Sequence, residues 1–157
     1  MNEKIRFFEE IASNAHVALN VVQYDGWLLR SAYGYTNRAN SISVLYPSTI
    51  DFEKKITYCE EYYKKQNLPC VFKLTDDDVE SSDFLEKRGY EVVTPTEEWI
   101  SSYFLYGGIT DVSKQDIFRQ MLSKLQVVQS NRVALDMYTK LGYEKVYSYW
   151  YMKKETT

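Results

Sequence analysis

Two stretches of the chain share one pattern, in which a short apolar strand leads into a short helix that ends at Gly-Tyr-Glu, and a second strand follows. The first stretch spans residues 71–93 and the second spans residues 125–146. Glycine after a helix tolerates the left-handed backbone that ends the helix, so Gly89 and Gly142 indicate where the two helices end. Because strands and helices alternate, the pattern predicts an α/β fold with helices packed on a sheet.

Composition limits what such a chain can bind and where it can reside. The chain has 157 residues, of which 45% are apolar and 26% are charged, as expected of a folded globular domain. A net charge of −3 argues against nucleic acid as a partner, because phosphate backbones bind basic surfaces. No apolar run is long enough to cross a membrane, and no signal-peptide pattern is present. We therefore expect a cytoplasmic protein in which Cys59 and Cys70 are reduced.

Hydrophobic periodicity and turn residues predict the elements outside the second repeat. Residues 3–19 and 79–88 have helical spacing, and a further helix runs from a capping box at Ser48 to about Gln66, with its Lys and Glu residues facing solvent. The side chains expected on the buried face of that helix are Phe52, Ile56, Cys59 and Tyr63. The predicted strands are residues 27–33, 40–46, 70–75, 90–94 and 98–106.

The connection before the second repeat lacks the residues that normally form a turn. A predicted helix beginning near Ser113 meets the strand-like residues 125–129 with no Gly, Pro, Asn or Asp between them. One interpretation is that a segment has been lost here. The alternative is that one helix continues through residues 125–129. We expect an N-terminal unit over residues 1–112 and a closing unit over residues 113–157, together in one compact domain.

The second repeat resembles the C-terminal end of the GNAT N-acetyltransferase superfamily. The matching motifs are Asn131-x-x-Ala134 and Tyr138-x-Lys140-x-Gly142-Tyr143, and residues 25–30, 34–41 and 55–60 are similar to the front half of two-part GNAT proteins. The resemblance implies a mixed, twisted sheet with helices on both faces and acetyl transfer from acetyl-CoA to an amine. It also implies that Tyr138 is the catalytic general acid and that Asn131 and Lys140 bind the cofactor.

The chain departs from that family at the turn that holds the cofactor's pyrophosphate. The family uses a glycine-rich turn at a helix N-terminus, where free backbone N–H groups bind phosphate. None of the six glycines lies in such a motif, and the turn at residues 46–51 carries a proline and an acid instead. We therefore expect acetyl-CoA binding to be weak or absent. The alternative function is a non-catalytic GNAT-like binding or dimerisation module.

Few other residues suggest a site. Arg38 and Asn40, beside a predicted strand start, are candidates to bind substrate, although a solvated turn has the same composition. The single histidine, His16, lies among apolar residues, and we expect no metal site. Because a strand–helix–strand unit cannot bury both faces alone, we expect either that it joins the sheet of the first unit or that the chain forms a homodimer through its C-terminal segment.

Overall fold

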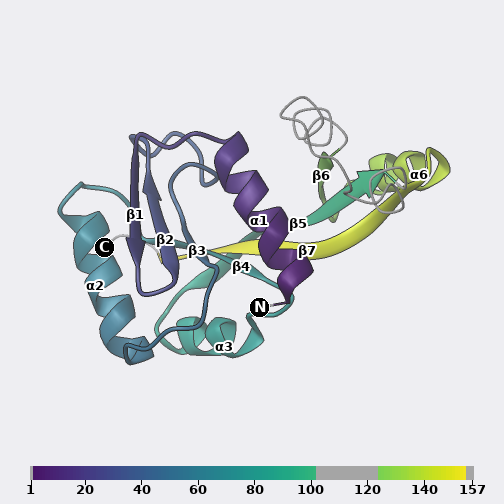
Figure 1. Cartoon of the computed structure of the whole chain (residues 1–157). Helices are drawn as coiled ribbons and strands as arrows, with labels where there is room; N and C mark the ends of the chain where they lie inside the picture. Colours follow the sequence, from purple (N-terminus) through teal and green to yellow (C-terminus); the bar gives the residue numbers. More distant parts are fainter. Residues whose placement is uncertain (1, 102–123, 155–157) are drawn as a thin grey trace. The chain divides into compact units, whose positions relative to one another are not determined.

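The structure is a computed structural model that describes residues 2–101 and 124–154 (Figure 1). The described part of the chain contains helices and strands in a mixed α/β arrangement, as predicted. The helices are α1 (Glu3–Ala15), α2 (Phe52–Lys64), α3 (Val79–Lys87) and α6 (Arg132–Lys140). The strands are β1 (Asn20–Tyr24), β2 (Trp27–Ser31), β3 (Ile42–Val44), β4 (Val71–Thr75), β5 (Glu91–Ser101), β6 (Lys124–Val128) and β7 (Tyr143–Lys153). They form one seven-stranded sheet in the order β1-β2-β3-β4-β7-β5-β6.

The chain divides into two compact units. The first comprises Met1–Val93 together with Trp150–Thr157, and the second comprises Thr94–Tyr149. Strand β7 contributes residues to both units, since the division falls between Tyr149 and Trp150. The first unit contains β3-α2-β4-α3 followed by the start of β5, which confirms the predicted alternation over residues 40–94.

The first unit opens its sheet with a hairpin whose first strand the sequence analysis missed. Strands β1 and β2 pair antiparallel, and Tyr24 lies opposite Trp27 across a two-residue turn. Both turn residues have positive φ, 43° at Asp25 and 83° at Gly26, which matches the twist of a tight hairpin. A Cβ atom on Gly26 would lie 2.6 Å from the carbonyl oxygen of Tyr46, so this position requires glycine.

One face of this sheet forms the apolar core beneath α2 and α3. The parallel pairing of β3 with β4 places Ile42 opposite Phe72, and both side chains are fully buried. The core cluster consists of Trp27, Leu29, Ile42, Ile56, Cys59, Tyr63, Phe72, Leu74, Leu85, Tyr90 and Met152. The cluster includes Ile56, Cys59 and Tyr63, so the predicted buried face of α2 is confirmed.

The other face of the first unit's sheet carries polar side chains beneath α1. Arg30 on β2 and Lys73 on β4 alternate with core residues, so they point to the opposite side. Both bond to α1: Arg30 to backbone carbonyls and Lys73 to Glu9. Helices therefore cover both faces of the sheet, consistent with a GNAT-like α/β fold.

Helix α2 differs from its prediction at its start and on its polar face. Its N-cap is Asp51, whose side chain accepts a hydrogen bond from the backbone N–H of Lys54, so the cap expected at Ser48 was wrong. The expectation that every lysine of the helix faces solvent was also wrong, because the Lys55 side chain is completely buried. The reason is an aspartate partner in the β1–β2 turn, which periodicity within the helix cannot reveal.

Helix α3 and strand β5 follow the prediction with one change. Gly89 has φ of 91° and ends α3 as expected. The two strands predicted at residues 90–94 and 98–106 are one strand, β5, which continues through Thr94 despite its φ of 52°. Residues 102–106 and the predicted helix near 113–124 lie outside the described residues.

The second unit contains the strand–helix–strand pattern of the second repeat. Strand β6 pairs antiparallel with β5, with Val127 opposite Glu97, and α6 and β7 follow it. The alternative in which one helix runs through residues 125–129 was therefore wrong. In the strand order, β7 stands between β4 and β5, and the homodimer expected through the C-terminal segment stays a prediction.

Candidate functional site

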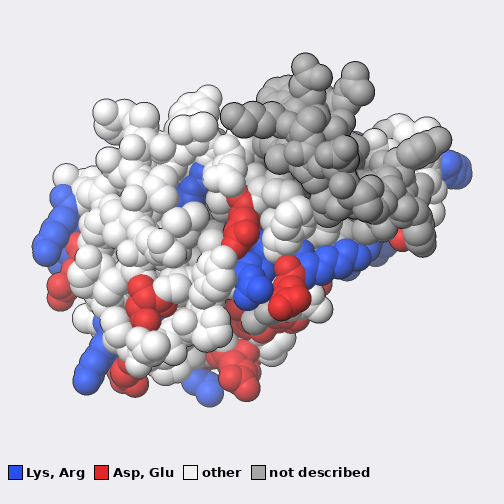
Figure 2. All heavy atoms as spheres, viewed as in Figure 1, with Lys and Arg blue, Asp and Glu red and all other residues white. Residues whose placement is uncertain are grey.

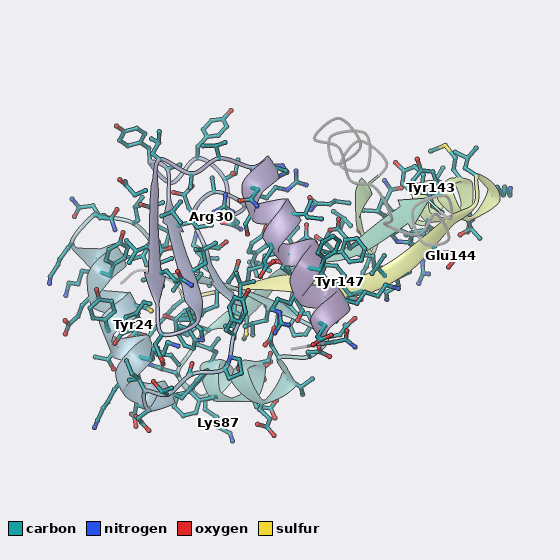
Figure 3. All side chains as sticks on the ribbon, in the orientation of Figure 1. Tyr24, Arg30, Lys87, Tyr143, Glu144 and Tyr147 are labelled. Carbon is teal, nitrogen blue, oxygen red and sulfur yellow. The ribbon has the colours of Figure 1, made fainter. Side chains whose placement is uncertain are left out.

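Helix α6 carries the three residues that the resemblance assigns to catalysis and cofactor binding. Asn131 is the N-cap, and its side chain accepts a hydrogen bond of 3.2 Å from the backbone N–H of Ala134. Tyr138 is half-buried, with its ring 5.9 Å from that of Tyr143 between centroids, and Lys140 is exposed in the last turn. Figure 3 shows Tyr143 at the start of β7, beyond the end of α6. Seven residues at about 1.5 Å each separate Asn131 from Tyr138 along the helix axis by about 10 Å.

The loop between β2 and β3 carries the two predicted substrate-binding residues in different environments. The Asn40 side chain is buried, and its Oδ1 accepts hydrogen bonds from the backbone N–H groups of Ala32 (2.6 Å) and Gly34 (2.9 Å). Its Nδ2 donates to the carbonyl oxygens of Thr36 (2.7 Å) and Ala32 (3.4 Å). These bonds engage both ends of the amide, so Asn40 holds the loop. Arg38 is exposed, so its guanidinium faces solvent while its carbonyl oxygen accepts a bond from Arg30.

The turn between β3 and α2 shows whether a phosphate fits at the start of this helix. The backbone N–H groups of Thr49 and Ile50 donate to the carboxylate of Asp25, at 3.0 Å and 2.9 Å. The Thr49 hydroxyl donates to the same carboxylate at 2.7 Å. Several hydrogen bonds hold the pKa of Asp25 well below its usual range, and the bond from the Ile50 N–H lowers it most. Asp25 therefore occupies the position that an anionic ligand would take, and a coenzyme A pyrophosphate does not fit here.

The side-chain amine of Lys55 also contacts this turn. Its Nζ donates to the Asp25 carbonyl oxygen and to Oγ of Ser48, and lies 4.0 Å from the centre of the Trp27 ring. Burial lowers the pKa of Lys55, and the nearby Asp25 carboxylate opposes that shift. A serine beside a buried lysine can be a nucleophile, but here the neighbouring N–H groups that would stabilise an oxyanion already bind Asp25. The cluster is therefore suited to joining the hairpin to α2.

The remaining described helix N-termini differ in charge. Helices α1 and α3 each have an acid in the first turn, Glu3 and Glu80. The N-cap of α3, Asp78, also accepts hydrogen bonds from Thr75, and burial raises the pKa of Asp78. Helix α6 has no acid in its first turn, which begins with Arg132. Each described helix N-terminus in the first unit therefore has an acid beside it.

A buried polar layer beneath α1 was not predicted from the sequence. The Lys73 Nζ lies 2.6 Å from each carboxylate oxygen of Glu9, and the two side chains are 9% and 2% exposed. The Arg30 guanidinium donates to the carbonyl oxygens of Ser13, His16 and Arg38, which places the end of α1 beside the β2–β3 loop. Figure 3 shows Arg30 on β2 near the upper end of α1. The sequence feature that could have indicated this polar layer is the one charged residue inside each apolar strand, Arg30 in β2 and Lys73 in β4.

A second polar network joins α2 to the end of α3. The Arg88 guanidinium makes a two-pronged bond to Glu60, with distances of 3.1 Å and 2.8 Å, and the Tyr90 hydroxyl donates to the same carboxylate at 3.1 Å. Burial raises the pKa of Glu60, but Arg88 and Tyr90 together outweigh it and leave that pKa lowered. Such charge-assisted bonds fix the two helices to each other.

Within residues 2–101 and 124–154, no group of three or more His, Cys, Asp or Glu side chains is arranged to hold a metal ion. No helix within the same ranges has the length and apolar character needed to span a membrane.

A comparison with known protein families gives a match in the N-terminal part of the chain. Residues 2–103 match the family described as probable histone acetyltransferase Rv0428c C-terminal. The match contains Arg38 and Asn40, whereas Asn131, Tyr138 and Lys140 lie outside it. No curated protein and no solved structure gives a significant match to the chain.

Proposed function

We propose that the chain is a GNAT-type N-acetyltransferase-related protein with an impaired cofactor site. The basis is that the chain belongs to the probable histone acetyltransferase Rv0428c C-terminal family. The implied chemistry is acetyl transfer from acetyl-CoA to an amine. The observation that carries the impairment is the Asp25 carboxylate, which binds the N–H groups of Thr49 and Ile50 at the start of α2. A pyrophosphate would meet a fixed negative charge there instead of free donors.

The proposed site residues have the roles that the resemblance implies. Tyr138 is the candidate general acid, since a phenol can donate a proton. Asn131 and Lys140 are the candidate cofactor contacts. Of the two candidate substrate contacts, the exposed Arg38 is better suited than Asn40, whose amide is engaged by the loop backbone. We propose a cytoplasmic location for this activity.

A second candidate function is a non-catalytic binding or dimerisation module with the same fold. The Asp25 contact favours it, because a general acid contributes nothing unless the thioester is held in place. The two candidates make different predictions about peptide-dependent release of coenzyme A and about Tyr138.

Isothermal titration calorimetry with acetyl-CoA on the full chain tests the proposal. We expect no saturable heat, or a dissociation constant far above 10 μM, which corresponds to roughly −7 kcal/mol of binding free energy. A dissociation constant near or below 10 μM would overturn the impairment. Desulfo-coenzyme A is the matched probe, since it retains the pyrophosphate but lacks the thiol.

Release of coenzyme A thiol in the presence of a lysine-rich peptide separates the two candidates. If the chain is an enzyme, Tyr138→Phe lowers kcat with little effect on cofactor affinity, because only the proton-donating hydroxyl is lost. Tyr143→Phe is the matched control, since the two rings are neighbours. Peptide-dependent release that is absent in the wild type favours the non-catalytic module, whereas release that is equal in the wild type and Tyr138→Phe argues against Tyr138 as the general acid.

A further inference from the structure

Strand β1 is at one end of the strand order, and among the described residues no strand pairs with its edge away from β2. Tyr24 and Trp27 are partners across the two-residue turn, and in such a turn the carbonyl oxygen of the residue before it accepts from the N–H of the residue after it, so we expect the backbone groups of Tyr24 to face β2. Backbone direction alternates along a strand, so Val22 also faces β2, while the N–H and C=O groups of Val21 and Gln23 face outward. The N–H of Arg30 donates to Ser41 on the β3 side, as this alternation requires.

This edge lacks the features that usually prevent strands from pairing. Natural edge strands carry lysines, prolines or bulges that block another strand. Residues 17–24 contain no charged residue and no proline. Three apolar side chains on and before β1 are more than half exposed: Val17 (83%), Leu19 (62%) and Val21 (55%). Figure 2 shows the surface at β1 as mostly white, which marks residues other than Lys, Arg, Asp and Glu.

The nearest charged residue does not restore that protection. Asp25 follows β1 directly, but its carboxylate is directed to Thr49, Ile50 and Lys55. The Tyr24 ring is likewise held, stacked on Tyr58 with 4.3 Å between centroids. The edge is thus uncharged, and the ring of its last residue packs on α2.

We propose that β1 pairs antiparallel with β1 of a second copy of this chain, about a two-fold axis through Val22. This register places Val21 opposite Gln23 of the second copy, and Gln23 opposite Val21. These are the residues whose N–H and C=O groups face outward, so each such pair exchanges two backbone hydrogen bonds. Val22 lies opposite its own counterpart, and the two sheets become one continuous sheet.

Self-pairing fits this strand better than pairing with a charged peptide. A two-fold axis brings identical residues together, so a charged strand would repel itself. The uncharged sequence Asn-Val-Val-Gln-Tyr avoids that repulsion and offers no charge to select a charged partner. The Val21 side chain, exposed in the single chain, is covered across the new strand pair. This assignment does not depend on whether the chain turns over acetyl-CoA.

Light scattering coupled to size-exclusion chromatography of the full chain tests the proposal at about 50 μM, where an interaction near −6 kcal/mol or stronger is populated. We expect the wild type to have twice the 18.6 kDa mass of the chain. Val21→Lys should return the mass to that of one chain, because two lysines would approach across the axis. Val128→Lys is the matched control, since Val128 is 43% exposed on β6 at the other end of the strand order.

A second substitution tests the backbone bonds directly. Gln23→Pro removes an outward N–H that the single chain does not use, and proline is tolerated on the free side of an edge strand. It should abolish the dimer while the thermal midpoint of the monomer stays near that of Val21→Lys. A wild type of 18.6 kDa at 50 μM overturns the proposal, as does a dimer that survives both β1 substitutions. A dimer lost only in Val128→Lys also overturns it and places the interface in the C-terminal segment.

Discussion

The carboxylate of Asp25 lies 3.2 Å from the Nζ of Lys55, and these two residues connect the β1–β2 turn to α2. The Asp25 side chain is 12% exposed and the Lys55 side chain is fully buried. Because the same carboxylate binds the N–H groups of Thr49 and Ile50, one side chain both neutralises a buried cation and caps a turn.

Asp25→Asn should reduce stability at neutral pH and change how the protein responds to acid. The folded-state pKa of Asp25 is lowered, so its ionised form favours folding above the ordinary value near 3.9. That contribution disappears as pH falls through the lower folded-state pKa. Urea unfolding from pH 7 down to about 3 should therefore show a smaller acid loss in the variant than in the wild type. Asp136→Asn, at an exposed position on α6, should leave the profile unchanged.

Lys73→Met should destabilise the first unit by about 3–5 kcal/mol, because Glu9 remains buried without its lysine partner. The double variant Glu9→Leu with Lys73→Met should recover most of this loss, since neither charge is then buried. Chemical denaturation of the single and double variants measures the coupling. Glu3→Gln, which removes an exposed pair with Arg6 on the same helix, should cost at most about 1 kcal/mol. Equal losses in the single and double variants would contradict this account.

Asn40→Ala should destabilise the protein by about 1–3 kcal/mol, because backbone groups of the β2–β3 loop lose their partners. Asn40→Asp should not restore stability, since a carboxylate cannot donate to the carbonyl oxygens of Ala32 and Thr36. Arg38→Ala, in the same loop, should leave the thermal midpoint near that of the wild type. A normal midpoint for Asn40→Ala would show that its bonds do not hold the loop.

Both cysteines should react slowly with thiol reagents in the folded protein. Burial raises the pKa of Cys59 to about 12 and also raises that of Cys70, so little reactive thiolate is present at pH 8. Labelling with a disulfide reagent should be slow without denaturant and fast in urea, where each thiol recovers a pKa near 8.5. Rapid labelling of the buried Cys59 or the half-buried Cys70 in the native protein would contradict this expectation.

The sequence predicted the elements whose stability depends on neighbouring residues. The repeats are strand–helix–strand units, and the apolar stripe of α2 packs as its spacing indicated, with Ile56, Cys59 and Tyr63 fully buried. The missed features depend on residues far apart in the chain. Lys55 is next to Ile56 in the helix, and the Asp25 carboxylate, which is distant in sequence, neutralises its buried charge. Strand β1 was missed because five residues carry little periodicity until β2 pairs with them.

Of the candidate site, the sequence predicted only the part that depends on local helix capping. Asn131 caps α6, as an asparagine before a helix should, and this contact alone explains its position. The polar layer beneath α1 could not be predicted, because Glu9 and Lys73 lie on separate elements and meet only when α1 packs on the sheet. The roles of Tyr138 and Lys140 stay predictions.

Because β7 is divided between two units, the core of the first unit can be completed only late in translation. Met152 is fully buried in the core of the first unit, and Trp150 packs against that core. Residues 94–149 are synthesised before either of them, so the first unit cannot complete its core during translation of residues 1–93. In sequence, the second unit is thus inserted between two parts of the first. The first unit can complete its folding only after the end of β7 has been synthesised.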